Sequence, residues 1–453
     1  MKKFFLYLLM VYPLLSFNGV GEEAHLLSIQ TIKDTIAPAE FVRPEPADWF
    51  TGDIHVHRSC DGSQPVTITE LQAMMRVNHL SVISVLGDMG NNKSADRIED
   101  LNKVNEKDSP LSSDGQIIHY SAEWHWDATQ WEHPHQALGG HLVLLGLKKA
   151  HKIWDESAYK VLDYAGAQNA VRGFAHMQYL NNAIQKDLDC CIPIDYPVEA
   201  ALGNIEFVAE EQTGGSENGI LAYYRLLNCG FRLALAGGTD YPCNNVPLGS
   251  VMTYVQIPGK KLTYQNWIEG IRKGRTVVSR NAHNEFIDLK VNQTGGPGTD
   301  IRLKADSAIT IEAGWSAVEE MTGRIELVCN GKVIASKSGT AKPGSPLLIR
   351  ATQRIPASSW ISARRMDASG RVHFLHTSPA YVTVNDRPVR TSAGDAQYFV
   401  AWIDNILNQI EPGGAWNRYF PTELEAAKKR YRKARDIYST IAAEAVSITN
   451  RKQ

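Results

Sequence analysis

From about Thr51 to Val278, short apolar runs alternate with amphipathic segments, and this alternation constrains the fold more than any other feature. The runs have the length and composition of buried strands, and apolar residues recur at helical spacing between several of them. Thr67 and Glu70 have the spacing of a capping box, which predicts a helix over Thr67–His79. Further helices are predicted at Asp155–Gln168, Tyr179–Leu188, Glu217–Leu227 and Tyr264–Lys273, and strands at Asp53–His57, Leu80–Gly87, Ile117–Glu123, Leu142–Leu147, Val171–His176, Asn204–Val208, Leu233–Thr239 and Val251–Ile257. Repeated alternation predicts an α/β domain with a parallel, barrel-like sheet over residues 51–283, with its chemistry at the carboxyl ends of the strands.

The pattern changes at Asn284. Short alternating strands with Gly, Asn and Pro turns predict a small β-sandwich over residues 284–390, in which Asn330-Gly331 and Ser369-Gly370 are hairpin-type turns. Residues 391–453 are predicted to be C-terminal helices. A stripe of apolar residues there indicates a packing surface. The basic stretch from Lys428 to Arg435 is interpreted as the solvated face of the same helix.

The first residues have the features of a targeting segment. Residues 1–21 combine Lys2-Lys3, a short apolar run and small residues, which predicts a cleavable signal peptide. Residues 22–50 are predicted to be an extended lead-in to the first domain. The apolar run is too short to span a membrane, and no later stretch is long enough. No cysteine lies near the predicted cleavage region, so we expect a periplasmic or secreted protein without a lipid anchor.

Charge and cysteine content narrow the classes of partner. The formal net charge of the 453-residue chain is -2, without the basic excess of a nucleic-acid-binding protein. An oxidising compartment would permit disulfides, but their connectivity cannot be read from the spacing of the cysteines. The six are Cys60, Cys190, Cys191, Cys229, Cys243 and Cys329.

The stretch Gly52-Asp-Ile-His-Val-His-Arg-Ser-Cys-Asp-Gly62 contains two histidines two residues apart. Successive side chains of a strand alternate between its faces, so His55 and His57 share one face. Two neighbouring imidazoles suit a divalent cation, since each offers a neutral ring nitrogen. The alternative is a half-exposed strand with two solvated histidines.

Further metal-ligand residue types stand at the ends of the other predicted strands. Glu123 ends one run and His141 opens the next, so an antiparallel hairpin would make them neighbours. His176, Asp240 and Asp88 end three more runs. Each alone is more often structural, but histidines and carboxylates gathered at strand ends predict a site for two bridged cations.

These motifs fall in the order seen in the polymerase-and-histidinol-phosphatase (PHP) superfamily. The chain most resembles its secreted branch of carbaryl-hydrolase-like CehA/McbA metallohydrolases, through Gly52-Asp-Ile-His-Val-His, Glu123, Gly140-His-Leu-Val-Leu-Leu-Gly, Phe174-Ala-His, Tyr223-Tyr-Arg-Leu-Leu-Asn-Cys-Gly-Phe-Arg and Gly238-Thr-Asp. The resemblance covers roughly residues 51–280. It implies a distorted (β/α)7 PHP-type barrel with a metal cluster. One metal would be held by His55, His57, Glu123 and Asp240, and a second by the bridging Glu123 with His141 and His176.

The sequence departs from the family pattern at two strand ends. Where the family often has Asp-His, this chain has Asp88-Met89, and where it often has Asp-x-His, this chain has Asp240-Tyr241-Pro242. Both missing histidines belong to the third metal position of trinuclear members. We therefore expect at most two divalent ions, zinc first and manganese or iron as alternatives. The loss also puts phosphoester specificity in doubt, because a third cation helps to hold phosphate.

Aromatic residues follow Glu123 and could form a substrate pocket. Trp124, Trp126 and Trp131, with Tyr241 beyond Asp240, could contact a sugar ring or an aromatic group. The alternative is a loop that packs on its own aromatic core. His133-Pro-His135 is interpreted as polar loop residues.

The function predicted is a secreted metal-dependent hydrolase that cleaves an ester-type bond: a carboxylic ester, a carbamate or a phosphoester. Asp240 is the predicted proton shuttle, and Asp88 is a second candidate. The expected substrate is a small or glycan-derived molecule; the sequence does not predict the oligomeric state. The alternative is a secreted protein of weak catalytic activity whose barrel or sandwich binds glycan or a partner.

Overall fold

The computed structural model describes residues 41–60, 63–90, 94–125, 140–153, 157–180, 183–186, 192–211, 217–304, 307–420 and 422–450, without the side chains of residues 125 and 446–450. The chain divides into two compact units, Met1–Val42 and Arg43–Gln453. The second unit contains all of the elements below. The predicted signal peptide and most of the lead-in lie outside the described residues.

Strands and helices alternate in the first part of this unit, as predicted. In chain order they are β1 (Trp49–Val56), α2 (Ile68–Val77), β2 (Val82–Asp88), α3 (Ala95–Leu101), β3 (Ile117–His125), β4 (His141–Leu145), α4 (Ala158–Ala167), β5 (Val171–Phe174), the 3₁₀ turn η1 (Met177–Tyr179), α5 (Tyr196–Leu202), β6 (Phe207–Glu210), α6 (Asn218–Asn228), β7 (Ala234–Gly237), β8 (Met252–Gln256), α7 (Tyr264–Arg272) and β9 (Thr276–Ser279). The capping box that begins α2 is present, with Thr67 and Glu70 each bonded to the other's backbone N–H.

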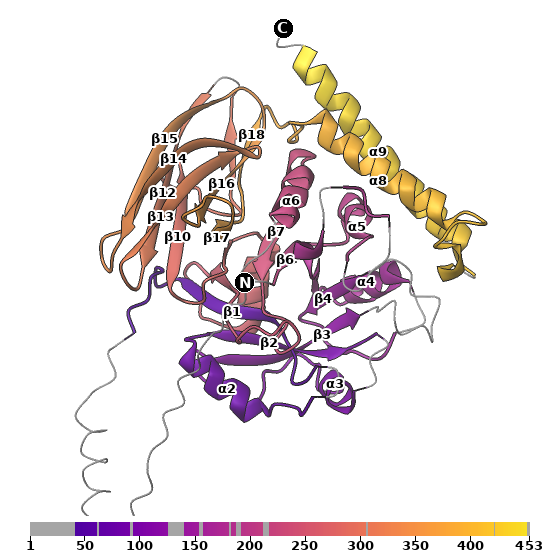
Figure 1. Ribbon diagram of the computed structural model, residues 1–453, viewed down its shortest axis with the longest axis horizontal. Helices are drawn as coiled ribbons and strands as arrows, with labels where there is room; N and C mark the ends of the chain where they lie inside the picture. Colours follow the sequence, from indigo (N-terminus) through magenta and orange to yellow (C-terminus); the bar gives the residue numbers. More distant parts are fainter. Residues whose placement is uncertain are drawn as a thin grey trace, which may run out of the picture. The chain divides into compact units, whose positions relative to one another are not determined.

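The strands belong to a large mixed sheet (Figure 1). Strands β1 to β7 lie in sequence order, and β8 borders β1 on the other side. The pairs β1–β2, β2–β3, β5–β6 and β6–β7 are parallel, whereas β4 is antiparallel to both β3 and β5. The prediction of a parallel sheet is therefore wrong at β4, while the predicted β3–β4 hairpin pairing is confirmed.

The two faces of β1–β7 bury separate hydrophobic clusters. One cluster contains Ile83 and Val85 with residues of α2, α4, α5 and α6. The other contains Val82 and Leu86 with Trp267 of α7. The chain after β7 returns to β1, where Tyr241 forms a parallel bridge with Val56. Both faces of the sheet are therefore covered, as the near-continuous apolar runs of its strands require.

The second part of the unit continues the same sheet. Its strands are β10 (Glu285–Val291), β11 (Asp300–Leu303), β12 (Ser307–Ala317), β13 (Met321–Cys329), β14 (Lys332–Ala341), β15 (Leu347–Ile355), β16 (Ser359–Met366), β17 (His373–Thr377) and β18 (Ala380–Val384). Strand β17 pairs with β9, which joins β11, β13, β14, β16 and β18 to the large sheet. Strands β10, β12 and β15 form a three-stranded sheet. The predicted strands are confirmed, and so is the Asn330-Gly331 turn between β13 and β14, with both residues at positive φ. A separate sandwich stays a prediction.

Two long helices, α8 (Ala393–Ile410) and α9 (Leu424–Asn450), follow and pack along each other (Figure 1). Of the predicted apolar stripe of α9, Ala427, Tyr431, Ala434 and Tyr438 are buried and Leu424 is partly buried. The basic stretch is not simply a solvated face: Arg430 bonds Glu199 of α5 at 2.9 Å, and Arg435 bonds Asp404 of α8. In the described part of the chain, no helix is long and apolar enough to cross a membrane.

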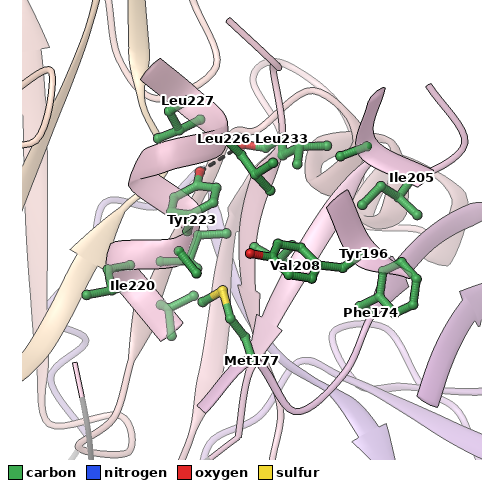
Figure 2. Close-up of a cluster of buried hydrophobic side chains, with 14 of the residues drawn as sticks. Phe174, Met177, Tyr196, Ile205, Val208, Ile220, Tyr223, Leu226, Leu227 and Leu233 are labelled. Atoms are coloured by element: carbon green, nitrogen blue, oxygen red, sulfur yellow. Dashed lines mark hydrogen bonds between the residues drawn. The ribbon is translucent and has the colours of Figure 1, made fainter. Parts of the chain in front are cut away.

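A buried cluster beside β5 and β6 fixes the chain after β5 (Figure 2). Met177 packs there with residues of α6, and the Tyr223 hydroxyl donates to the Leu233 carbonyl at 2.8 Å. The helix predicted at Tyr179–Leu188 is wrong over the described residues, where only the short turn η1 forms. Packing of Met177 thus holds the neighbouring His176 in place.

Candidate metal centre

Strand ends bring the predicted ligands together. His55 is near the end of β1, where the β1–β2 register shifts between Asp53 and Val56. Glu123 of β3 pairs with Val143 of β4, two residues along the strand from His141. His176 follows β5 and Asp240 follows β7, and both have positive φ (59° and 50°), a conformation that costs non-glycine residues energy and is common at functional sites.

Two buried groups of side chains could each hold a metal ion. The first is His55, His57 and Asp240, and in each group the ligand atoms lie within 4.8 Å of one another. The Nε2 atoms of His55 and His57 are 3.1 Å apart. Asp240 Oδ1 is 3.3 Å from His55 Nε2 and 3.5 Å from His57 Nε2. Two imidazoles and one carboxylate form a donor set that suits zinc and similar cations.

The second group is Glu123, His141 and His176. His141 Nδ1 lies 2.8 Å from His176 Nε2 and 2.8 Å from Glu123 Oε1. Glu123 also reaches the first group, since its Oε1 is 3.4 Å from His55 Nε2 and its Oε2 is 3.0 Å from His57 Nε2. The structure thus places Glu123 between the groups, where a bridging carboxylate would stand.

The outer ring nitrogens show how the histidines are oriented. His57 Nδ1 lies 3.1 Å from the Leu86 carbonyl, which can only accept, so Nδ1 carries the proton and the Nε2 lone pair faces the group. His55 Nδ1 donates to Glu211 Oε1 at 2.7 Å, and His176 Nδ1 pairs with Glu211 Oε2. Such outer partners fix the tautomer of metal-binding histidines.

The charges and protonation states of these residues favour binding of a cation. Burial lowers the pKa of His57, and the Arg97 guanidinium lowers it further, so His57 is held neutral. Burial opposes a charge on His55 as well, but Asp240, Glu211 and Glu123 outweigh it and raise its pKa well above the usual value. Burial raises the pKa of Asp240. The Nε2 lone pair of a neutral His57 lies close to carboxylate oxygens, and these electron-rich atoms repel one another. A cation bound between them would remove this repulsion.

Sequence reasoning missed several residues that shape this centre. Glu211 accepts from His55 Nδ1, pairs with His176 Nδ1 and, through Oε2, accepts from the His176 backbone N–H at 3.1 Å. The sequence signal that could have identified Glu211 is the pair of adjacent carboxylates, Glu210 and Glu211, at the end of the β6 run. Asp53, whose pKa burial raises to about 6, accepts from the Thr239 hydroxyl at 2.6 Å and its N–H at 3.0 Å. It thereby ties the chain after β7 to β1.

Glycine permits this close approach. A Cβ on Gly238 would lie 2.8 Å from both Asp53 Oδ1 and the His55 backbone nitrogen. The backbone before Asp240 therefore lies directly against β1. A disulfide between Cys60 and Cys243 joins the segments beyond β1 and β7. The sequence could not identify this pairing.

The remaining predicted site residues lie around the two groups. Asp88 is fully buried beside Glu123 in the β2–β3 register and accepts from the Gly90 N–H at 2.7 Å, outside both metal groups. Tyr241 is partly buried, and its carbonyl accepts from the His57 N–H at 2.7 Å. Trp124 lies in the hydrophobic core with its Nε1 bonded to the Ile153 carbonyl, which favours packing over substrate contact. Trp126 and the residues up to 139 lie outside the described ranges.

Comparisons with known proteins give no family. No protein-family model matches the chain, and no curated protein is similar to it in sequence. Among solved structures, the CARDB domain of a Pyrococcus furiosus protein is 9% identical, over 22% of this chain and 89% of that chain, with a TM-score of 0.17. A modular endo-beta-1,4-mannanase from Cellulomonas fimi is 13% identical, over 42% of each chain, with a TM-score of 0.13. At these scores neither bears on the fold or the function of this chain.

Proposed function

We propose that this protein is a metal-dependent hydrolase of the PHP type, with two divalent cations in a distorted (β/α)7 barrel. The observation that carries the proposal is Glu123, a buried carboxylate whose two oxygens face histidines of both groups. The return of the chain after β7 to β1 supports the barrel. The likeness to CehA/McbA proteins in the order of the motifs supports the same assignment.

The residues fit such a pair of cations. His55, His57 and Asp240 would hold one, and His141 and His176 the other, with Glu123 shared. Bound there, the cations would polarise a water and stabilise negative charge on the ester being cleaved. Glu211 keeps the His55 and His176 lone pairs directed at the cations. Burial limits the access of bulk water to these groups.

Asp240 is the proposed proton carrier. Its Oδ1 lies 3.3 Å from His55 Nε2 and 3.5 Å from His57 Nε2, so this carboxylate would stand beside a water held at the first group. Asp88 is the second candidate, but the Gly90 N–H already occupies its Oδ1. The proposed substrate is a small or glycan-derived ester.

The disulfide between Cys60 and Cys243 supports the proposed periplasmic or secreted location, because such bonds persist in oxidising compartments. N-terminal sequencing of the protein recovered from its natural host tests this, and we expect a mature chain that begins near Glu22. A mature chain that retains residues 4–12 would contradict it.

Metal analysis and a substrate panel test the function. The purified chain is stripped with a chelator, reloaded with zinc, manganese or iron, and assayed with chromogenic carboxylic esters, carbamates and phosphoesters. We expect up to two equivalents of metal and metal-dependent hydrolysis of at least one class. A chain that binds no metal refutes the proposal. A metal-loaded chain that cleaves none of these esters points instead to the binding-protein alternative.

A further inference from the structure

A second cavity lies at the end of the sheet opposite the candidate metal centre. It has a volume of about 450 Å³, and its lining comes from the start of β3, the end of β4 and the start of α7. Strand β4 is antiparallel to β3, so its last residues lie beside the first residues of β3. The lining residue His119 comes four residues before Glu123 on β3, which separates their Cα atoms by about 13 Å. The cavity is therefore distinct from the metal groups.

A hydrogen-bonded layer closes this cavity toward the metal groups. His119, Ser121 and Glu123 share one face of β3, because alternate residues of a strand point the same way. The Tyr264 hydroxyl bonds Ser121 Oγ at 2.8 Å and Ser84 Oγ of β2 at 2.9 Å. The Tyr264 ring stacks on the imidazole of His119, with the ring centroids 3.7 Å apart. These side chains are buried, so they separate a ligand in the cavity from Glu123.

His119 offers a hydrogen-bond acceptor to the cavity. The residue is 3% exposed, and its Nδ1 lies 2.8 Å from Asp108 Oδ1. A carboxylate can only accept, so Nδ1 carries the proton and a neutral His119 has its lone pair on Nε2. Within the described part of the chain, Nε2 forms no hydrogen bond. A buried polar atom without a partner costs free energy, which a donor on a ligand would recover.

The rest of the lining mixes acceptors with donors. Asp108 and Glu106 supply carboxylate oxygens, and the ammonium of Lys148 lies 3.7 Å from Glu106. Asn169 and Gln265 add side-chain amides, each of which can both donate and accept. A ligand that satisfies this lining therefore needs donors and acceptors close together.

This requirement disfavours most classes of ligand. Two carboxylates repel an anion, and an apolar molecule would leave the polar groups unpaired. In the described ranges, the carboxylates do not form a metal-binding group with His119. An ammonium would satisfy the acceptors but meet the positive charge of Lys148. A hydroxyl group both donates and accepts, so several hydroxyls on one small ring match the whole lining.

We propose that this cavity is a sugar-binding site, separate from the metal centre, that takes one monosaccharide unit through its hydroxyl groups. One hydroxyl would donate to His119 Nε2 and a neighbouring one to Asp108, while Lys148 would donate to a sugar oxygen. The volume of the cavity lies within the range of small-molecule sites. This inference goes beyond the proposed function and does not depend on it. The site would attach the protein to a glycan without taking part in hydrolysis.

Titration of sugars into the full chain tests the site. Glucose, galactose, mannose, xylose and N-acetylglucosamine are titrated calorimetrically, with ethanolamine as the probe for ammonium binding. The variants are Asp108→Asn and His119→Phe, and folding is measured on each. Phenylalanine keeps an aromatic ring against Tyr264 but has no ring nitrogen. The matched control is Asp114→Asn, because the Asp114 carboxylate is exposed, pairs with Lys261 at 3.1 Å and does not line the cavity.

We expect at least one sugar to bind the parent at millimolar concentration. Asp108→Asn should bind it roughly tenfold more weakly, because a charged acceptor becomes neutral. His119→Phe removes the buried acceptor and should weaken binding roughly tenfold to a hundredfold. Asp114→Asn should bind like the parent. Chelator-stripped and metal-loaded parent should bind the sugar equally, and Asp108→Asn should keep the parental kcat/KM for a small chromogenic ester.

Several results would overturn the site. A parent that binds none of the five sugars, or binds only ethanolamine, contradicts recognition through hydroxyl groups. Sugar affinity in both variants within about threefold of the parent shows that the cavity is not where the sugar binds. If His119→Phe does not fold, Asp108→Asn alone decides. Sugar binding that disappears when the metals are removed places the sugar at the metal centre instead. A parent that binds sugar but takes up no metal refutes only the proposed function.

Discussion

Glu211→Gln is the sharpest test of how the metal centre is built. The carboxylate of Glu211 accepts from His55 Nδ1 at 2.7 Å and from the His176 backbone N–H at 3.1 Å, and it also pairs with His176 Nδ1. Although burial raises its pKa, His176 and His55 hold it well below the usual value, so it is ionised. Glutamine nearly preserves the volume but replaces one accepting oxygen with an amide nitrogen.

The size of the effect follows from these contacts. At least one imidazole N–H must lose its acceptor, and a hydrogen bond to a charged group contributes about 1.5–3 kcal/mol. At about 1.4 kcal/mol for each factor of ten, metal affinity should fall roughly tenfold to a hundredfold. The two groups share Glu211, so both equivalents should weaken.

Competition with a chromophoric chelator measures the affinity, and Glu210→Gln is the matched control. Glu210 is the neighbouring residue, but its carboxylate bonds His373 at 2.9 Å, away from the metal groups. The control should change stability and leave metal affinity unchanged. If Glu211→Gln binds both metals within about threefold of the parent, the proposed orienting role is wrong.

Four further outcomes are expected. Glu123→Gln should keep the fold, lose at least one metal and lower kcat by roughly a thousandfold or more; unchanged metal content with kcat within about threefold of the parent would refute the bridge. His141→Ala should remove about one equivalent of metal without unfolding, and full occupancy would exclude it as a ligand. Reducing the Cys60–Cys243 disulfide should lower stability by about 2–5 kcal/mol and weaken metal binding, because it joins the segments beyond β1 and β7; an unchanged melting temperature would contradict this. His376 has its pKa lowered to about 3 by burial, with His373 and Arg364 adding to the effect, so below about pH 6.5 the unfolded chain takes up a proton that the folded chain does not. Stability on the order of 4–5 kcal/mol should be lost as pH falls from about 6.5 to about 3, and His376→Gln should flatten that slope; parallel pH profiles would argue against it.

Strand ends were predictable because apolar runs reveal where buried strands stop. His55, Glu123, His176 and Asp240 each stand at or beside such an end, and the structure brings them together. The antiparallel β3–β4 pairing was an option that the sequence raised for two consecutive apolar runs, and the structure has it. Periodicity therefore located the ligand residues along their strands.

The supporting residues were not predictable in the same way. Arg97 comes from α3, a short helix whose contact with β2 depends on Gly87 rather than on an apolar repeat. Glu211 lies one residue past β6, and its role depends on which strand lies opposite. Over the described residues of the helix predicted at Tyr179–Leu188, only the end of the short turn η1 forms, beside the buried Met177. Such three-dimensional neighbours leave no periodic signal in the sequence.

The end of β6 links the metal centre to the second part of the unit. Successive residues of an extended chain point in opposite directions, so Glu211 faces the ligand histidines and Glu210 faces His373 of β17. His373 in turn bonds Glu217 beside α6 at 2.9 Å. Although burial of Glu210 opposes it, His373 and the other positive charges near Glu210 lower the pKa of this carboxyl to about 2. Glu210 therefore joins β6 to β17, while the adjacent Glu211 contacts the histidines of the metal groups. This continuity connects residues 284–390 to the strand that precedes Glu211.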